Sequence, residues 1–211
     1  MRQMFANREE AGDRLAEVLV GVDRDRLLVL GLAPGGVPVA ERVAHALGGA
    51  LDALVVHRVP SPRNPDRAIG AVTAAGPAHF ERASLDVLGL SEGDLEGTVA
   101  SGREEVRRRE TAYRGSGPGF DIEGMDVIVV DDALVNGMSA RAALTALRER
   151  SPASLVLAAP VGEQQAVRSL SELCDQVVCL MAPDDFQEAD RWYGEYPHVA
   201  DDSVRSLLGR S

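Results

Sequence analysis

The stretch from Asp126 to Arg148 constrains the fold of this chain more than any other. Val127 to Val130 form an uninterrupted β-branched run, which is typical of a strand covered on both faces of a parallel sheet. Asp131 and Asp132 follow at once. Because two carboxylates cannot continue a buried run without a large desolvation cost, the strand must reach the surface there, with both acids at its carboxyl end. In open α/β sheets, ligands bind at that edge.

A loop of small residues follows the acids and opens a helix over residues 140–148. Gly137 allows the backbone to approach a ligand closely, while Asn136 and Ser139 offer side-chain donors beside the free amides of the helix. Such a loop can bind an anion, and the acids behind it suit ribose hydroxyls or a hydrated Mg²⁺. We interpret the stretch as a holder for a sugar phosphate. The alternative is a solvated strand end and a plain Asn-Gly turn, but the flanking strand and helix favour the functional interpretation.

The order of these parts resembles the signature of the type I phosphoribosyltransferases. In that family four apolar residues, two acids and two apolar residues precede a Thr-Gly-x-Thr loop, which grips the 5′-phosphate of phosphoribosyl pyrophosphate (PRPP). This chain departs from the pattern at Asn136, where the family usually has Thr, and more mildly at Ser139. The resemblance implies an α/β fold with a doubly wound, mostly parallel sheet, a flexible lid loop and a C-terminal hood. The matching residues are Val127 to Val130, Asp131, Asp132, Ala133, Leu134 and Gly137.

A second glycine-containing loop follows an apolar strand predicted over residues 27–32. Its residues are Pro34, Gly35 and Gly36, and a tight structural turn is their ordinary interpretation. The resemblance instead implies the loop that holds pyrophosphate. Relatives with similar flanks read Pro-Arg-Gly-Gly-Val-Pro, whereas here Ala33 and Pro34 replace Pro and Arg, so the loop lacks its cation. Right-handed crossovers between the strands place both loops at one cleft.

The middle of the chain combines short predicted strands with a proline-containing segment. Arg58 directly follows a strand predicted over residues 54–57, and three prolines predict irregular structure over residues 59–65, before a short strand over residues 68–72. The resemblance implies that Arg58 lies near the pyrophosphate or the incoming nucleophile. A solvated surface cation is an equally good interpretation, both for Arg58 and for Arg63. Residues 75–101 lack periodicity, and the resemblance implies a lid that closes over the substrate.

The helix predicted over residues 102–113 is strongly charged, which indicates an exposed helix more simply than a phosphate-binding face. Strands over residues 155–161 and 176–181 then alternate with a helix over residues 163–173, as in a parallel doubly wound sheet. In the last segment, residues 183–211, a packed aromatic patch is the first interpretation. The resemblance implies a hood, and we hypothesise that one of its rings stacks on the acceptor. The aromatic residues concerned are Trp192, Tyr193 and Tyr196.

The composition limits the class of protein. The 211 residues carry a formal charge of −11 at pH 7, which argues against a general nucleic-acid or membrane binder. Two cysteines, Cys174 and Cys179, are too few for a disulfide scaffold and are expected to be reduced core residues. No apolar run approaches the ~18 residues of a membrane span, and residues 1–10 are too polar for a signal peptide. The simplest expectation is a single cytoplasmic domain over residues 1–211.

Further segments resemble a group of stand-alone bacterial phosphoribosyltransferase-like proteins. They are Glu10 to Gly12, Gly35 to Ala40, Asn64-Pro65 with Ala68 to Val72, Tyr113-Arg114 and Trp192-Tyr193. The resemblance implies transfer of a phosphoribosyl group from PRPP to an undetermined nitrogenous acceptor, with release of pyrophosphate. The Mg²⁺ would be carried on PRPP, without a metal site built from protein side chains alone. A homodimer is compatible with this assignment.

The resemblance also implies roles for individual residues. Asp131 and Asp132 would anchor the ribose hydroxyls, and Arg58 would act at the pyrophosphate. The residues expected to contact substrate are Pro34, Gly35, Gly36, Ala133, Leu134, Val135, Asn136, Gly137, Met138 and Ser139. A rival assignment is a non-catalytic regulator or sensor that binds a nucleotide or phosphosugar, which Asn136 and the missing loop Arg favour. A third, an unrelated α/β phosphatase or nucleotide-binding domain, would need its own nucleophile, and no motif supports Asp131 in that role.

Overall fold

The computed structural model describes residues 4–19, 26–115 and 119–209, so that residues 1–3 of the polar start and 210–211 of the predicted hood lie outside it. At its centre is a five-stranded sheet in the order β2-β1-β6-β7-β8, with all neighbouring strands parallel. The parallel sheet expected from the alternation of strands and helices is confirmed, and β1 lies beside β6 as the crossover rule predicts. The strands are β1 (Leu27–Ala33), β2 (Ala50–Val55), β6 (Asp126–Val130), β7 (Ser154–Val161) and β8 (Gln176–Met181).

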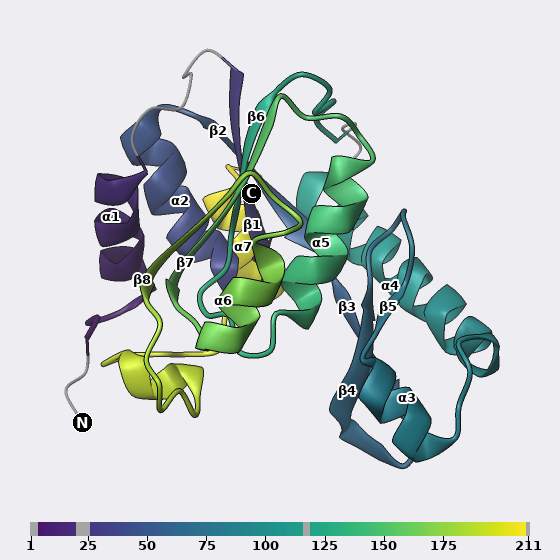
Figure 1. Ribbon diagram of the computed structural model, residues 1–211. Helices are drawn as coiled ribbons and strands as arrows, with labels where there is room; N and C mark the ends of the chain where they lie inside the picture. The colour runs from purple at the N-terminus through teal and green to yellow at the C-terminus, as the bar shows by residue number, and fades with distance from the viewer. Residues whose placement is uncertain (1–3, 20–25, 116–118, 210–211) are drawn as a thin grey trace.

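Helices cover both faces of this sheet (Figure 1). Ile128 of β6 packs with the helices of one face, α1 and α2, whereas Val129 packs with α5 and α6 on the other. Successive side chains of a strand point to opposite faces, so the part of a strand that is buried on both sides must be apolar, as Val127 to Val130 of β6 are. The helices are α1 (Arg8–Val18), α2 (Gly36–Leu47), α5 (Met138–Arg148) and α6 (Gln164–Leu170).

A second, smaller sheet lies to one side of the main sheet (Figure 1). Its antiparallel strands are β3 (His57–Ser61), β4 (Asn64–Val72) and β5 (His79–Phe80). The prediction of irregular structure over residues 59–65 is therefore wrong, and the strand predicted over residues 68–72 begins earlier. The prolines are tolerated because β3 is an edge strand whose pairing shifts register on both sides of Pro60, and Pro65 lies in the same irregular part of the ladder.

Residues 75–101, expected to be an irregular lid, contain regular structure. After β5 come α3 (Arg82–Leu88), the 3₁₀ helix η2 (Gly93–Leu95) and the start of α4 (Glu96–Arg114), which begins before the predicted residue 102. Leu85 and Leu95 are buried with Ile69 of β4 in a small core of their own. The prediction failed because α3 has only 7 residues, too few for a helical period to stand out among the surrounding glycines and acids. The lid function stays a prediction.

The C-terminal segment packs against the beginning of the described chain. Tyr193 is buried, its ring lies 5.5 Å from that of Phe5, and Trp192 stacks on Phe186 at 6.5 Å between ring centroids. The interpretation as a packed aromatic patch is confirmed for these two residues and for Tyr196, whose ring lies 5.0 Å from that of Tyr193. The segment also contains η3 (Ala189–Trp192) and α7 (Asp201–Leu207), and α7 contacts both α2 and α4. Within the described ranges, no helix combines the length and apolar character needed to cross a membrane.

Candidate functional site

The carboxyl ends of β1 and β6 bring both predicted loops to one rim of the sheet. A cavity of about 690 Å³ opens there, and Gly35, Asp131 and Asp132 line it together. The two loops are in direct contact. A Cβ atom added to Gly35 would lie 2.3 Å from a carboxylate oxygen of Asp132, and one added to Gly36 would lie 2.4 Å from the Val130 carbonyl oxygen. Glycine is therefore required at both positions by the packing of the turn on β6, in addition to any role in ligand binding.

Asp132 is committed to contacts within the protein. Its side chain is nearly buried, and its Oδ2 accepts hydrogen bonds from Arg8 Nε and from the Tyr196 hydroxyl, each at 2.8 Å. The Tyr193 hydroxyl donates to the Asp132 main-chain carbonyl at 2.7 Å. Arg8 donates in addition to the Pro197 carbonyl oxygen at 2.7 Å and lies over the Tyr196 ring. The network ties α1 and the C-terminal segment to the end of β6, a structural role that the prediction of a ribose anchor did not include.

Asp131 has different surroundings, although it is the adjacent residue. The residue as a whole is half-buried at the junction of the two loops, and Oδ1 accepts the Asp132 amide N–H at 2.9 Å. Burial, reinforced by the charge of Asp132, raises the pKa of Asp131 well above its usual value. Of the two predicted acids, Asp131 is therefore the one whose carboxylate is available to a ligand in the cavity.

The predicted phosphate loop forms a second cavity of about 220 Å³ at the start of α5. Gly137 adopts a φ of 70° directly before the helix, and Asn136 Oδ1 accepts the Met138 amide N–H at 3.1 Å. This contact is an Asx turn, so Asn136 organises the loop and already engages one of the amides expected to hold phosphate. Ser139 lines both cavities.

The three residues between the acids and Asn136 differ in exposure. Ala133 and Leu134 are 8% and 1% exposed, and the Leu134 amide donates to the Val161 carbonyl at the end of β7 at 2.9 Å. These residues fix the start of the loop, and any contact they make with a ligand comes from the backbone. Val135 is 46% exposed at the wall of the smaller cavity.

The structure brings Arg58 to the site and leaves Arg63 away from it. The prediction that Arg58 directly follows a strand is wrong. The strand β2 ends at Val55, and Arg58 lies within β3, where it is paired with Ala71. Its side chain lines both cavities. Arg63 lies at the far end of the small sheet, beside a separate cavity of about 300 Å³, and donates to the Leu88 carbonyl at 3.3 Å.

Several residues that line the larger cavity were not predicted from the sequence. They are Arg8, His57, Arg109 and His198. Tyr196, one of the aromatic residues hypothesised to stack on the acceptor, lines this cavity as well, and the stacking stays a prediction. Arg109 belongs to the helix interpreted as solvent-exposed, an interpretation that holds for Arg108 and fails for Arg109. Its only sequence signal is the aromatic Tyr113 four residues on, with which it shares one helix face.

Other chemistry-bearing residues stand apart from this rim. Cys174 is buried and Cys179 half-buried, both are free thiols, and burial raises the pKa of each, that of Cys179 to about 11. Cys174 is a core residue, as expected, whereas Cys179 is only half-buried, and their reduced state stays a prediction. Among the residues that the structure describes, no group of three or more His, Cys, Asp or Glu side chains is placed to hold a metal ion. Asp131 remains as a single available carboxylate at the cavity.

Known proteins resemble the chain over most of its length. A family model described as "Phosphoribosyl transferase domain" matches residues 3–191. The chain is 31% identical over 209 residues to two Mycobacterium tuberculosis proteins, named "Putative phosphoribosyl transferase MT0597" and "Putative phosphoribosyl transferase Rv0571c". These matches cover 99% of this chain and 47% of each relative, so the chain spans about half the length of the curated relatives it matches.

Two solved structures are also similar to this chain. TT1426 from Thermus thermophilus superposes with a TM-score of 0.81 at 37% identity, covering 99% of this chain and 98% of that one. AQ2163 from Aquifex aeolicus has a TM-score of 0.52 at 8% identity, covering 89% and 84% of the two chains, which indicates a shared fold alone. Taken with the two loops that meet at the rim of the sheet, the family match over residues 3–191 shows that the chain belongs to the phosphoribosyl transferase domain family.

Proposed function

We propose that this chain binds PRPP and transfers its phosphoribosyl group to a nitrogenous acceptor, with release of pyrophosphate. The observation that carries the proposal is a pair of adjoining cavities, of about 220 and 690 Å³, which share Arg58, Asp131, Asp132 and Ser139. A sugar with phosphate groups at both ends can occupy the two cavities together, with its ring at the shared residues. Family membership supports PRPP as that sugar.

Each end of the ligand would meet the start of a helix. The amides around Gly137 and the Ser139 side chain, at the start of α5, would hold the 5′-phosphate. The turn at Gly35 and Gly36, at the start of α2, would face the pyrophosphate. Asp131, between the two, would accept hydrogen bonds from the ribose hydroxyls.

The reaction exchanges one bond at the anomeric carbon for another. The bond from this carbon to the pyrophosphate oxygen breaks, and the oxygen keeps the electron pair. The lone pair of the acceptor nitrogen forms the new bond from the opposite face, and the nitrogen releases its proton to solvent. The sugar carries positive charge in the transition state, and the Asp131 carboxylate at the junction of the cavities would stabilise it.

The residues present fit a Mg²⁺ ion that arrives on PRPP. Mg²⁺ prefers oxygen ligands and is usually held by one or two carboxylates together with substrate phosphates. Asp131 offers a carboxylate at the cavity, whereas that of Asp132 is bonded to Arg8 and Tyr196. When bound, the ion would offset the charge of the departing pyrophosphate.

A second candidate function is a non-catalytic sensor that binds PRPP or a related phosphosugar. The observation that favours it is the 2.8 Å ion pair between Arg8 and Asp132, which neutralises one of the two signature acids. Pyrophosphate release measured with PRPP and a panel of nitrogenous bases distinguishes the two. Release with any one base supports the transferase, and binding of PRPP without release from the whole panel supports the sensor.

Isothermal titration with PRPP in MgCl₂ tests the binding step. We expect the wild-type chain to bind at millimolar concentration or below, and Asp131→Asn to weaken binding about tenfold, since a hydrogen bond to a charged group is worth about 1.5–3 kcal/mol. Asp126→Asn, at the start of the strand that leads to Asp131, is the matched control and should change the affinity less than about twofold. An absence of binding to the wild-type chain at millimolar PRPP contradicts the proposal.

A further inference from the structure

The proposed pyrophosphate site lacks a charged side chain in its own loop. The turn from Ala33 to Gly36 offers backbone amides and no cation, yet a pyrophosphate carries several negative charges. Amides and a helix start favour an anion, but polyphosphates are usually also met by Arg or Lys. Three arginines line the 690 Å³ cavity, namely Arg8, Arg58 and Arg109.

Two of these arginines face other partners or the other end of the ligand. Arg8 is nearly buried, pairs with Asp132 at 2.8 Å and donates to the Pro197 carbonyl oxygen. Arg58 also lines the cavity of the phosphate loop, together with Ser139, and so lies on the side of the 5′-phosphate. Arg109 lines instead a neighbouring cavity of about 510 Å³, and Pro34 of the glycine turn lines it too. Arg109 is therefore the arginine on the side of the turn.

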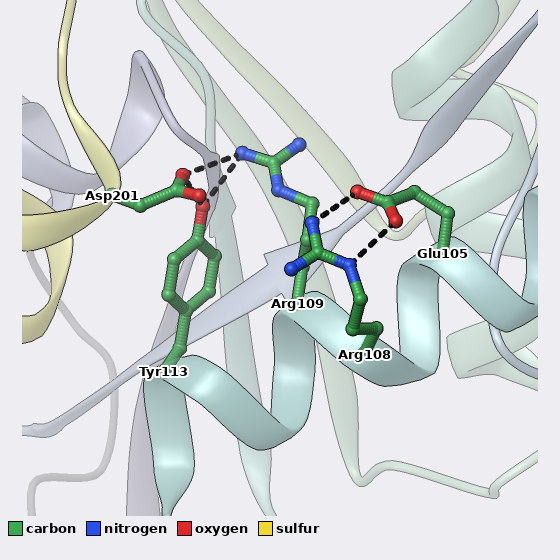
Figure 2. A network of polar contacts seen from close by, with 5 residues as sticks. All are labelled: Glu105, Arg108, Arg109, Tyr113 and Asp201. Carbon is green, nitrogen blue, oxygen red and sulfur yellow. Dashed lines mark hydrogen bonds and ion pairs between the residues drawn. The ribbon is translucent and has the colours of Figure 1, made fainter.

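Arg109 is held in place by the C-terminal helix. Its Nη2 donates to the Tyr113 hydroxyl at 2.6 Å and to Asp201 Oδ1 at 3.0 Å, and the Tyr113 hydroxyl itself donates to Asp201. Both anchors use the same terminal nitrogen, and Figure 2 shows the other terminal nitrogen pointing away from them. A guanidinium fixed at one corner presents its remaining donors to an anion with less loss of side-chain entropy on binding.

The neighbouring Arg108 is the natural comparison. It forms two hydrogen bonds of 2.7 Å to Glu105 on the same helix, and its side chain is 66% exposed against 22% for Arg109. Arg108 lines the 510 Å³ cavity but does not line the 690 Å³ one. The two arginines thus have the same charge and adjacent positions, and they differ in access to the proposed site (Figure 2).

We propose that Arg109 is the cation of the pyrophosphate subsite, with Tyr113 and Asp201 as its positioning residues. The inference rests on the proposed function, because it assigns a partner to the leaving group of PRPP. Arg109 would bind the pyrophosphate oxygens through the donors that face the cavity, opposite the amides of Gly35 and Gly36. The cation that binds pyrophosphate would thus come from α4 and not from the glycine turn. The C-terminal helix α7 would contribute to the site through Asp201, which holds Arg109.

Titration with two fragments of PRPP tests this assignment. Inorganic pyrophosphate with Mg²⁺ probes the subsite of Arg109, and ribose 5-phosphate probes the phosphate loop. We expect Arg109→Gln to weaken pyrophosphate binding about tenfold or more, since a charged hydrogen-bonding partner is lost, and to leave ribose 5-phosphate binding within about twofold. Arg108→Gln should change neither. Arg109→Lys, which keeps the charge but not the fork, should fall between wild type and Arg109→Gln.

The contrary outcomes distinguish a wrong assignment of Arg109 from a wrong proposed function. If Arg109→Gln binds pyrophosphate as the wild type does, or loses both ligands equally, the assignment of Arg109 is wrong. If the wild type binds ribose 5-phosphate and not pyrophosphate, the assignment of the pyrophosphate subsite is wrong, while the assignment of the phosphate loop is supported. If the wild type binds neither fragment nor PRPP, the proposed function fails. Tyr113→Phe adds a measure of positioning and should weaken pyrophosphate alone, by about threefold.

Discussion

At the scale of single residues, Asp131 and Asp132 show how neighbours in a sequence acquire different chemistry. Asp132 is paired with Arg8 and bonded to Tyr196, so its charge is compensated inside the protein. Asp131 is half-buried beside it, and its carboxylate accepts the Asp132 amide N–H without an arginine or tyrosine partner like those of Asp132 among the described residues. Asp131 is thus a candidate to contact a substrate, and Asp132 connects the end of β6 to α1 and the C-terminal segment.

The raised pKa of Asp131 predicts how stability depends on pH. Because the folded state binds this proton more tightly than the unfolded state, the ionised carboxylate destabilises the fold as pH rises from the ordinary Asp value of about 4 through the raised pKa. Asp131→Asn should therefore be more stable than the wild type at pH 7.5, and the difference should vanish near pH 4. A gain of about 1 kcal/mol would appear as roughly 2–4 °C in Tm. A variant less stable than the wild type at pH 7.5 contradicts this account.

Arg8 should matter for stability far more than its place in a surface helix suggests. Arg8→Met leaves Asp132 buried without its counter-ion, which we expect to cost about 3 kcal/mol in the free energy of unfolding, measured with urea. Arg14→Met on the same helix breaks an exposed pair with Glu10 and should cost less than about 1 kcal/mol. Adding Asp132→Asn to Arg8→Met should recover part of the loss. Equal losses in the free energy of unfolding for the two arginine variants would show that the buried pair does not stabilise the contact between these segments.

At the scale of elements, the site depends on how closely α2 approaches β6. The helix begins at Gly36, and this start lies against the last carbonyl of the strand, at Val130. Only a residue without a Cβ atom allows that approach, so the same glycine that opens the turn towards a ligand also sets the position of the helix. The small sheet, through His57 and Arg58 of β3, supplies another part of the cavity lining.

The substitution Gly36→Ala tests the contact between α2 and β6. The added Cβ atom would lie 2.4 Å from the Val130 carbonyl oxygen, and the helix must shift, at a cost of about 1–3 kcal/mol. Gly97→Ala on α4 is the matched control, because nothing lies within 4 Å of its Cβ position and alanine favours a helix by about 1 kcal/mol. Thermal unfolding should therefore move in opposite directions for the two variants. A Gly36→Ala variant as stable as the wild type would contradict the close packing.

At the scale of the whole molecule, the elements on which the main sheet depends could be predicted from sequence. The apolar run from Val127 to Val130, and the acids and glycine that follow it, identify the central strand and its loop through local pattern alone. The Arg8–Asp132 pair and the Arg109–Asp201 pair could not be predicted, because each joins segments far apart in the chain. The small sheet was missed because its prolines lie on an edge strand and in a shifted register, where the rule against proline in strands does not apply.

The central claim is that one sugar phosphate spans both cavities at this rim of the sheet. A crystal structure of the chain soaked with PRPP and Mg²⁺ tests it most directly. The account predicts density for the 5′-phosphate at the amides around Gly137, for the ribose at Asp131, and for the pyrophosphate between Gly35 and Arg109. Density for PRPP at another surface, or a phosphate loop without ligand at saturating PRPP, would contradict it.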